Sequence, residues 1–175
     1  MTLKLAILDD YQGVALEMAD WSILPSDIEI TVFRDTLADL DAVATRLAPF
    51  EILAAMLERT PFPRPLFEKL PNLKLLVTTG MRNGAIDMKA AADHGITVCG
   101  TAGNPESTVE MIWALIQAAV RRLPQQDKAA REGKWQTSVG WTLAGRTIGL
   151  LGLGRLGART AAIANFFNMR VVAWS

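Results

Sequence analysis

Three glycines at GxGxxG spacing are the residues best suited to bind a cofactor. Gly152, Gly154 and Gly157 follow the apolar run 147–151 and precede a helical pattern, and a second apolar run occupies 170–174. A strand, this motif, a helix and a second strand within about 30 residues are the setting of a dinucleotide-binding fingerprint. The first glycine permits a tight turn, the second lets the backbone approach a pyrophosphate, and the third allows close packing of helix on strand. The motif therefore predicts dinucleotide binding rather than a purely structural glycine turn.

The start of the predicted helix supplies the groups that would hold the phosphates. Unpaired backbone N–H groups near Arg155 and Leu156, together with the helix dipole, would bind a diphosphate. An acidic residue about 20 positions beyond the glycines would bond the ribose 2′-hydroxyl of NAD, and the residue there is Ser175. An uncharged serine does not repel a 2′-phosphate, so the sequence favours NADP over NAD and leaves both open.

Short apolar runs alternate with helical patterns through the first 100 residues. The pattern predicts strands at 4–8, 28–33, 51–57, 73–78 and 96–99, and helices at 14–18, 37–47, 66–70 and 85–93. This alternation implies crossover connections and a parallel sheet covered on both faces. We therefore expect an α/β protein.

The loop 100–104 leads into a strong helix start, and the domain boundary is expected there. Asn104 can cap the helix, Pro105 suits its first turn, and Ser107 with Glu110 matches a capping box. The predicted domains are therefore residues 1–100 and 101–175.

The helix predicted at 105–121 is apolar nearly all round. Val109 and Trp113 lie on one stripe, while Met111 and Leu115 make the other side apolar too. Such a helix must be buried on both sides, either as a central core helix or with its second face against a partner subunit. The polar segment that follows, to residue 141, is expected to be a surface excursion.

Composition excludes several classes of partner and site. The 175 residues are 50% hydrophobic and carry 18 Lys+Arg against 18 Asp+Glu, so no basic surface for nucleic acid is expected. The longest apolar stretch, 111–120, is about half of the ~20 residues that a bilayer span needs, and no signal pattern opens the chain, which favours a cytoplasmic protein without membrane contact. One cysteine and one histidine exclude an internal disulfide and a Cys/His zinc site.

Four other residues have both a functional and a structural interpretation. His94 lies at a helix end before a glycine, where a surface role is favoured over a catalytic one. Cys99 is interpreted as a small buried residue. Asp9 and Asp10 follow a parallel strand on the side where such sheets bind ligands, although a turn or helix-start role is favoured.

Several strings resemble the D-isomer-specific 2-hydroxyacid dehydrogenases, the family that includes phosphoglycerate, glycerate and formate dehydrogenases. The resemblance spans essentially the whole chain, and the combination of strings is more specific than any one of them. They are Leu8-Asp-Asp-Tyr11, Glu58-Arg-Thr-Pro-Phe-Pro63, Leu76-Val-Thr-Thr-Gly80, Gly95-Ile-Thr-Val98, Ser107-Thr-Val-Glu110, Gly133-Lys-Trp-Gln136 and Gly145-Arg-Thr-Ile-Gly149.

The resemblance implies a flavodoxin-like substrate domain followed by an incomplete Rossmann domain. The implied reaction transfers a hydride between NAD(P) and a D-2-hydroxy acid or 2-oxo acid. Backbone groups of Thr79, Gly80 and Met81 would hold the substrate carboxylate, and Thr108 would lie near the nicotinamide. The helix at 105–121 would contribute to a homodimer.

The chain departs from the family in two ways. Relatives commonly carry an arginine where this chain has Leu57, and a leucine cannot bind a carboxylate through two hydrogen bonds. The catalytic Arg, Glu and His of the family are expected in the half of the nucleotide domain beyond Ser175, so the 175 residues alone are expected to be inactive. A piece of a longer dehydrogenase is favoured over a short inactive product and over a dimerising or dinucleotide-binding module without catalysis.

Overall fold

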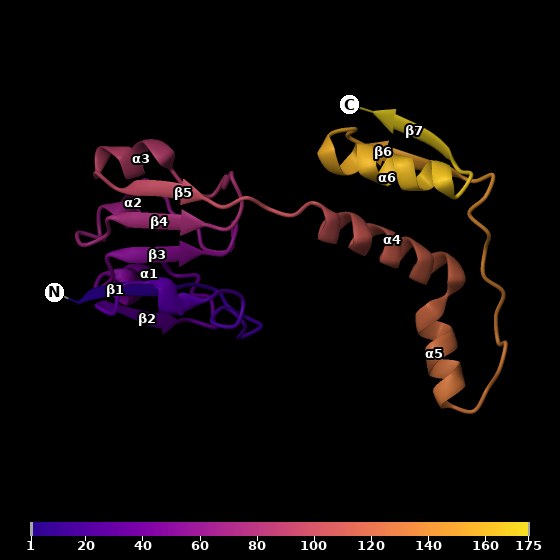
Figure 1. Cartoon of the computed structure of the whole chain (residues 1–175), viewed down its shortest axis with the longest axis horizontal. Helices are drawn as coiled ribbons and strands as arrows, with labels where there is room; N and C mark the ends of the chain where they lie inside the picture. The colour runs from indigo at the N-terminus through magenta and orange to yellow at the C-terminus, as the bar shows by residue number, and fades with distance from the viewer. Residues whose placement is uncertain (1, 175) are drawn as a thin grey trace. The chain divides into compact units, whose positions relative to one another are not determined.

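The computed structural model describes residues 2–174, which fold into two compact α/β units (Figure 1). The first unit comprises Met1–Gly103 and the second Asn104–Ser175. The prediction of an α/β protein with parallel strands is confirmed in both.

The first unit contains a five-stranded parallel sheet. Its strands are β1 (Leu3–Ile7), β2 (Ile28–Val32), β3 (Ile52–Ala55), β4 (Leu75–Thr78) and β5 (Thr97–Gly100). Their spatial order is β2-β1-β3-β4-β5, the flavodoxin-like order. The order reverses between β1 and β3, where such sheets bind ligands at the carboxyl ends of the strands. The five arrows point the same way in Figure 1, so these ends share one edge.

The two faces of this sheet are covered differently. Helices α1 (Leu40–Leu47), α2 (Arg64–Phe67) and α3 (Met88–Asp93) share one apolar core with inward residues of the strands, such as the fully buried Leu53. The opposite face packs against a segment that contains the short 3-10 helix η1 (Trp21–Ile23). Both faces of the sheet are thus covered, one by α-helices and the other by a largely irregular segment.

The prediction of a helix at 14–18 is wrong, because this segment forms turns. The Asp10 carboxylate accepts the N–H groups of Val14 (3.1 Å) and Ala15 (3.0 Å). The Trp21 indole N–H donates to the Ala15 carbonyl at 2.9 Å. The Asp10 carboxylate thus caps the first N–H groups of this segment, and the indole binds a carbonyl that a longer helix would have paired.

The second unit places a two-stranded parallel sheet beside helices. Its elements are α4 (Glu106–Arg121), α5 (Leu123–Arg131), β6 (Thr147–Leu151), α6 (Arg155–Phe166) and β7 (Arg170–Trp174). The bounds of β6 and β7 agree with the apolar runs in the sequence. The core joins α4 to α6 through Val109, Trp113 and Ala164, and an ion pair links Glu106 to Arg159.

Helix α5 was not expected, since its segment reads as a polar surface excursion. The helix is indeed mostly exposed, with Ala129 as its buried residue. Arg122 separates it from α4 by adopting a left-handed conformation with φ 54. The left-handed backbone of Arg122 thus ends the long apolar helix α4 and redirects the chain into the polar helix α5.

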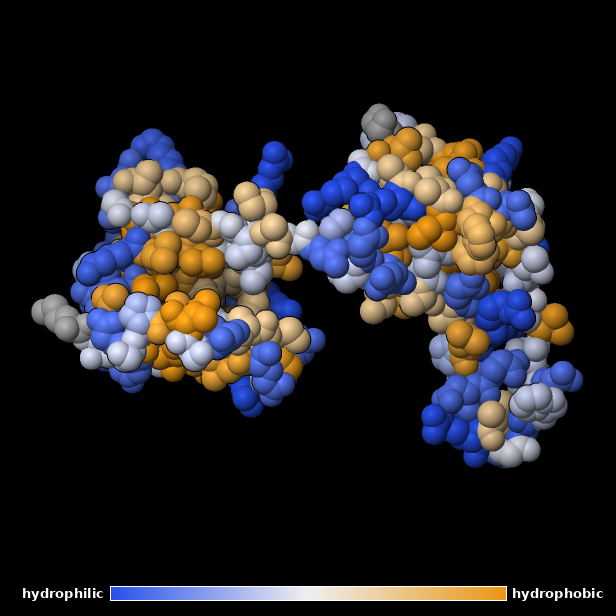
Figure 2. All heavy atoms as spheres, in the orientation of Figure 1, coloured by the Kyte–Doolittle hydropathy of each residue, from blue (hydrophilic) through white to orange (hydrophobic). Residues whose placement is uncertain are grey.

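Helix α4 buries one of its apolar faces within the described residues. Val109 and Trp113 are buried, whereas Met111 and Leu115 are 58% and 62% exposed, so α4 is not a central helix buried on both sides. Apolar residues, in orange, are visible on the surfaces of both units in Figure 2.

The start of α4 differs from the expected capping box. The Asn104 side chain accepts the Glu106 N–H at 2.9 Å, which fits its predicted capping role. The Ser107 hydroxyl donates back to the Asn104 carbonyl at 3.3 Å instead of pairing reciprocally with Glu110.

Candidate functional site

The glycine motif forms a tight connection between β6 and α6. Gly152 has φ 97 and its N–H donates to the Trp174 carbonyl at 2.7 Å, which fixes the turn to the end of β7. A Cβ built on Gly157 would lie 2.2 Å from the Gly152 carbonyl oxygen, so the helix approaches the turn more closely than any side chain permits. A Cβ on Gly154 would meet nothing within 4 Å, which leaves open space above the backbone. These are the three separate properties that a dinucleotide loop needs.

The N-terminus of α6 offers unpaired donors to an anion. Gly154 is the N-cap residue and no side chain caps the helix. The first intrahelical bond runs from the Ala158 N–H to the Gly154 carbonyl at 2.8 Å, so the N–H groups of Arg155, Leu156 and Gly157 precede the helical ladder. Twelve helical residues add their dipole, and this donor set fits a diphosphate.

The other residues expected to bind the cofactor are Thr108, the Arg155 side chain and Ser175. Thr108 is exposed in the N-terminal part of α4, and α4 contacts α6. Arg155 is also exposed and forms no ion pair within residues 2–174. Ser175, expected at the ribose, lies outside the described residues.

The predicted carboxylate-binding segment follows β4 at the carboxyl edge of the first sheet. The Thr79 N–H donates to the Ala55 carbonyl at 3.0 Å, and the Gly80 N–H donates to the Thr101 hydroxyl at 3.1 Å. The Met81 N–H has no partner in the part of the chain that the structure describes. A carboxylate could accept directly from Met81, whereas binding to Gly80 would require the Thr101 hydroxyl to rotate away.

Leu57 borders this segment. Its N–H donates to the Thr79 hydroxyl at 3.0 Å, and its carbonyl accepts from the Asn83 amide at 2.5 Å. A Cβ built on Gly80 would lie 3.3 Å from the Leu57 Cδ2 atom, so the leucine side chain is beside the Gly80 backbone. Leu57 is 49% exposed and forms an apolar wall where an arginine would have placed a positive charge.

An open hollow of about 340 Å³ lies next to Met81. Its lining is mainly apolar but includes the exposed Arg82. The lining residues are Thr78, Met81, Arg82, Asn83, Gly84, Ile86, Met88, Val98 and Gly100.

The two aspartates after β1 are both buried, but they make different contacts. The Ala15 N–H lowers the pKa of the Asp10 carboxyl most strongly, burial opposes this effect, and the Val14 N–H lowers the pKa further. The turn role predicted for Asp10 is therefore confirmed. Asp9 instead accepts from the Thr60 hydroxyl at 2.7 Å and from the Thr36 hydroxyl.

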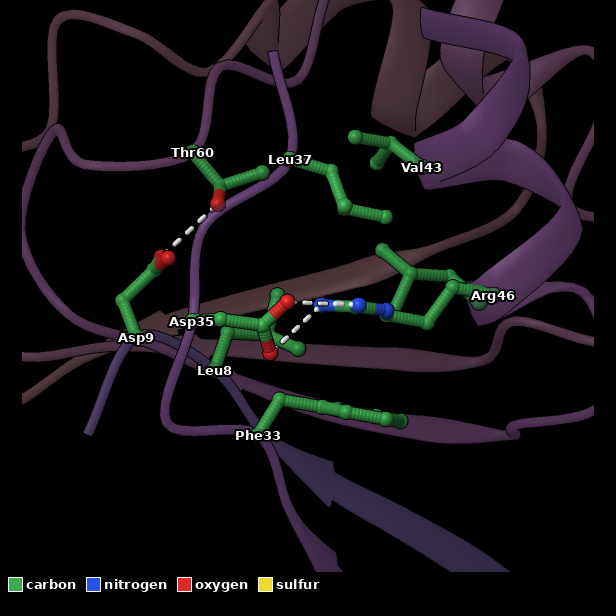
Figure 3. A pocket seen from close by; sticks show the side chains of 9 residues that line it. Leu8, Asp9, Phe33, Asp35, Leu37, Val43, Arg46 and Thr60 are labelled. Carbon is green, nitrogen blue, oxygen red and sulfur yellow. Dashed lines mark hydrogen bonds and ion pairs between the residues drawn. The ribbon is translucent and has the colours of Figure 1, made fainter. Parts of the chain in front are cut away.

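Asp9 lines a small, partly open pocket with a volume of about 10 Å³ (Figure 3), room for about one water molecule. On the opposite side of this pocket, the Arg46 guanidinium binds Asp35 at 2.8 Å and lowers the pKa of the Asp35 carboxyl through this hydrogen bond. Asp9 thus faces a pocket too small for a substrate. The sequence placed Asp9 at the correct edge, but it did not reveal the contact with Thr60, which lies 51 residues later.

His94 and Cys99 are both exposed. His94 ends α3, and its Nδ1 atom lies 2.8 Å from the Ala90 carbonyl, which confirms a surface position at a helix end. The prediction that Cys99 is buried is wrong. Cys99 shares a sheet face with Ile7 and Ala54, but the segment that covers this face packs over β1, β2 and β3 and not over the edge strand β5.

Two kinds of feature are absent from the part of the chain that the structure describes. No cluster of three or more His, Cys, Asp or Glu side chains within residues 2–174 could hold a metal ion. None of the helices in this range has the length and apolar character needed to cross a bilayer.

Comparisons with known proteins agree with this geometry. The family model for the NAD-binding domain of D-isomer specific 2-hydroxyacid dehydrogenases matches residues 113–175. Hydroxypyruvate reductase of Blautia hydrogenotrophica is 28% identical over 182 residues, covering 98% of this chain and 56% of the relative. Glyoxylate reductase of Korarchaeum cryptofilum is 36% identical over 119 residues, covering 64% of this chain and 36% of the relative.

The fold also matches solved structures. The crystal structure of phosphoglycerate oxidoreductase from Vibrio cholerae O395 superposes with a TM-score of 0.89 at 39% identity, covering 98% of this chain and 56% of that one. The chain thus spans about half the length of the relatives that match it throughout. It belongs to the D-isomer-specific 2-hydroxyacid dehydrogenase family.

Proposed function

We propose that the chain is part of an oxidoreductase that transfers a hydride between NAD(P) and a D-2-hydroxy acid or the corresponding 2-oxo acid. The first unit is the substrate domain and the second is part of the dinucleotide-binding domain. The observation that carries the proposal is the loop at 152–157, which combines three features. Gly157 packs too closely on Gly152 for a side chain, Gly154 has open space beside its backbone, and no side chain caps the start of α6. The matched family model covers the same segment.

Each unit would hold one reactant. The N–H groups of Arg155, Leu156 and Gly157 bind the diphosphate of the cofactor, and Thr108 lies toward its nicotinamide. The bound nicotinamide supplies or accepts the hydride. The backbone of Thr79, Gly80 and Met81 orients the substrate carboxylate, with the Met81 N–H as the donor that needs no rearrangement.

The chemistry also requires groups that we assign to no residue of this chain. Oxidation of an alcohol needs a base for the hydroxyl proton and a cation or donor that stabilises charge on the carbonyl oxygen. We do not assign this role to His94, because it lies between the end of α3 and the start of β5, at the amino ends of the strands, whereas the segment 79–81 follows the carboxyl end of β4. We therefore expect the 175 residues to bind ligands without turnover, and the catalytic Arg, Glu and His implied by the family resemblance to belong to a longer polypeptide.

Leu57 favours a particular substrate side chain. Its isobutyl group stands beside Gly80 without a charge, so a substrate that has no C3 atom or only a small uncharged group there would fit better than one with a phosphate. A 2-oxo acid of the glyoxylate or hydroxypyruvate type, as in the names of the reductases among the relatives, is the proposed class.

The exposed face of α4 is the proposed homodimer contact. Met111 and Leu115 present apolar surface one turn apart, on the side opposite the buried Trp113. Sedimentation should give a dimer of the 19.1 kDa chain, and Leu115→Glu should give a monomer that melts at the same temperature. A monomeric unmodified chain would contradict this assignment.

The binding part of the proposal is tested by calorimetric titration of the chain with NADH and NADPH. The unmodified chain should bind at least one of them. Gly154→Ala should weaken binding by about tenfold or more without changing the melting temperature, because its Cβ meets nothing in the free protein but occupies the space of the diphosphate. Gly149→Ala in β6 is the matched control, since its Cβ would lie at an ordinary 3.9 Å from Val172. A chain that binds neither cofactor would overturn the proposal for this unit.

A further inference from the structure

Three adjacent strands of the first sheet turn in the same way at their carboxyl ends. Two positions after the last residue of β1, β3 and β4, respectively, stand Asp9 with φ 59, Leu57 with φ 52 and Gly80 with φ 99. Glycine adopts this left-handed conformation freely and aspartate tolerates it, but leucine does so at a cost in free energy. Such a strained residue persists only where its surroundings fix it, so the contacts of Leu57 and its segment are the ones to trace.

Segment 57–60 is anchored on both sides. Toward β4, both backbone groups of Leu57 are bonded to side chains, as described above. Toward β1, the Arg59 guanidinium donates to the Asp9 carbonyl at 2.6 Å, and the Thr60 hydroxyl donates to the Asp9 carboxylate at 2.7 Å. Figure 3 shows this hydroxyl directed at the carboxylate.

Asp9 is suited to hold the segment in place. Its side chain is 1% exposed, and its second carboxylate oxygen accepts from the Thr36 hydroxyl in the loop after β2. No lysine or arginine within residues 2–174 forms an ion pair with this carboxylate, so the two threonine hydroxyls are the donors that compensate its burial. Because an unsatisfied buried carboxylate is costly, Asp9 favours the arrangement in which Thr60 stays in contact with it.

We propose that Asp9 is a positioning residue that, through Thr60 and Arg59, holds Leu57 in its left-handed conformation beside Gly80 and so shapes the wall of the carboxylate site. The functional half of this inference rests on the proposed function. The structural half, that the Asp9 contacts fix Leu57, does not depend on any ligand.

The structural half is tested by hydrogen exchange at the Leu57 amide, measured by NMR on the full chain. Thr60→Val removes a donor to Asp9 without changing the shape of a buried side chain, and exchange at Leu57 should accelerate by about tenfold or more. Thr36→Val is the matched control, because it removes a donor to the same carboxylate from another loop and should leave this amide unchanged. Thr60→Ser keeps the hydroxyl and should restore slow exchange.

Arg59→Met is the second variant, and because Arg59 is exposed its replacement leaves no cavity in the core. It should also accelerate exchange at Leu57. Unchanged exchange in both the Thr60→Val and Arg59→Met chains, or equal acceleration in Thr36→Val and Thr60→Val, would overturn the inference.

Titration with oxalate, an analogue of a 2-oxo acid, tests the functional half on the same variants. Oxalate affinity should fall in Thr60→Val and stay unchanged in Thr36→Val, which removes a donor to the same carboxylate from the exposed loop after β2. If the unmodified chain binds no oxalate, the proposed substrate site fails, while the exchange result still decides whether Asp9 positions Leu57. If oxalate binds equally well to all variants, the functional half is wrong.

Discussion

Gly157→Ala should weaken dinucleotide binding far more than it weakens the fold. The new methyl would lie 2.2 Å from the Gly152 oxygen, and real Cβ contacts essentially never fall below 3.0 Å, so helix and turn must separate by about 0.8 Å. That shift is enough to break at least one charge-assisted hydrogen bond from the helix start to the diphosphate. Such a bond is worth about 1.5–3 kcal/mol, or about 10- to 150-fold in Kd.

The effect of the same substitution on stability is smaller, because two terms oppose each other. Strain from an added methyl costs about 1–3 kcal/mol, while alanine is favoured over glycine in a helix by about 1 kcal/mol. The net loss is therefore about 0–2 kcal/mol, which urea unfolding can measure beside a calorimetric titration with NADH or NADPH. Gly149→Ala, whose Cβ would lie at an ordinary 3.9 Å from Val172, should leave cofactor binding unchanged and raise stability by at most about 1 kcal/mol. A folded Gly157→Ala chain that binds the cofactor as tightly as the unmodified chain would refute the close-contact argument.

Three further predictions concern the first unit. Leu53 is fully buried in the core under α1 to α3, so Leu53→Ala should lower the free energy of unfolding by about 2–5 kcal/mol in urea titration, and a loss below 1 kcal/mol would contradict its core role. The Ala15 and Val14 N–H groups keep the pKa of Asp10 below its ordinary value against the effect of burial, so its stabilisation is complete above about pH 4 and lost as the pH falls through the folded-state pKa. Asp10→Asn should accordingly flatten the decline of Tm below pH 4, and an unchanged decline would exclude this contribution. Cys99 should react with a disulfide reagent in the native chain about as fast as in urea, whereas strong protection would show that its exposed surface is covered in solution.

The sequence predicted the elements with a strong local signal. Strands β6 and β7 lie where two apolar runs are bounded by turn residues, and the glycine spacing between them is a local property of the chain. The helix at 14–18 failed because five residues of amphipathic pattern are too short to distinguish a helix from a turn. In this segment the Trp21 indole binds the Ala15 carbonyl, which is a contact from outside the segment that the local pattern does not reveal.

Burial could not be predicted where it depends on the order of the strands. Cys99 has the apolar neighbours typical of a buried strand residue, yet β5 is an edge strand, and the segment that covers this sheet face does not pack over it. Sheet order is a long-range property, and no local pattern around Cys99 reveals it. The exposure of Leu115 could not be predicted for the same reason. The pattern of α4 shows two apolar faces, but it does not show which of them packs against another part of the chain.

The candidate substrate site shows the same division between local and long-range information. Gly80 could be placed at a turn from its residue type, since glycine after a strand is a common sign of a left-handed residue. Leu57 could not, because leucine avoids that conformation unless distant residues fix it. The residues that fix it come from two other connections of the sheet, Asp9 after β1 and Thr79 and Asn83 after β4. They meet Leu57 or its segment only once the parallel strands have aligned their carboxyl ends. A wall of the site is therefore made by a residue whose own sequence neighbourhood favours another conformation.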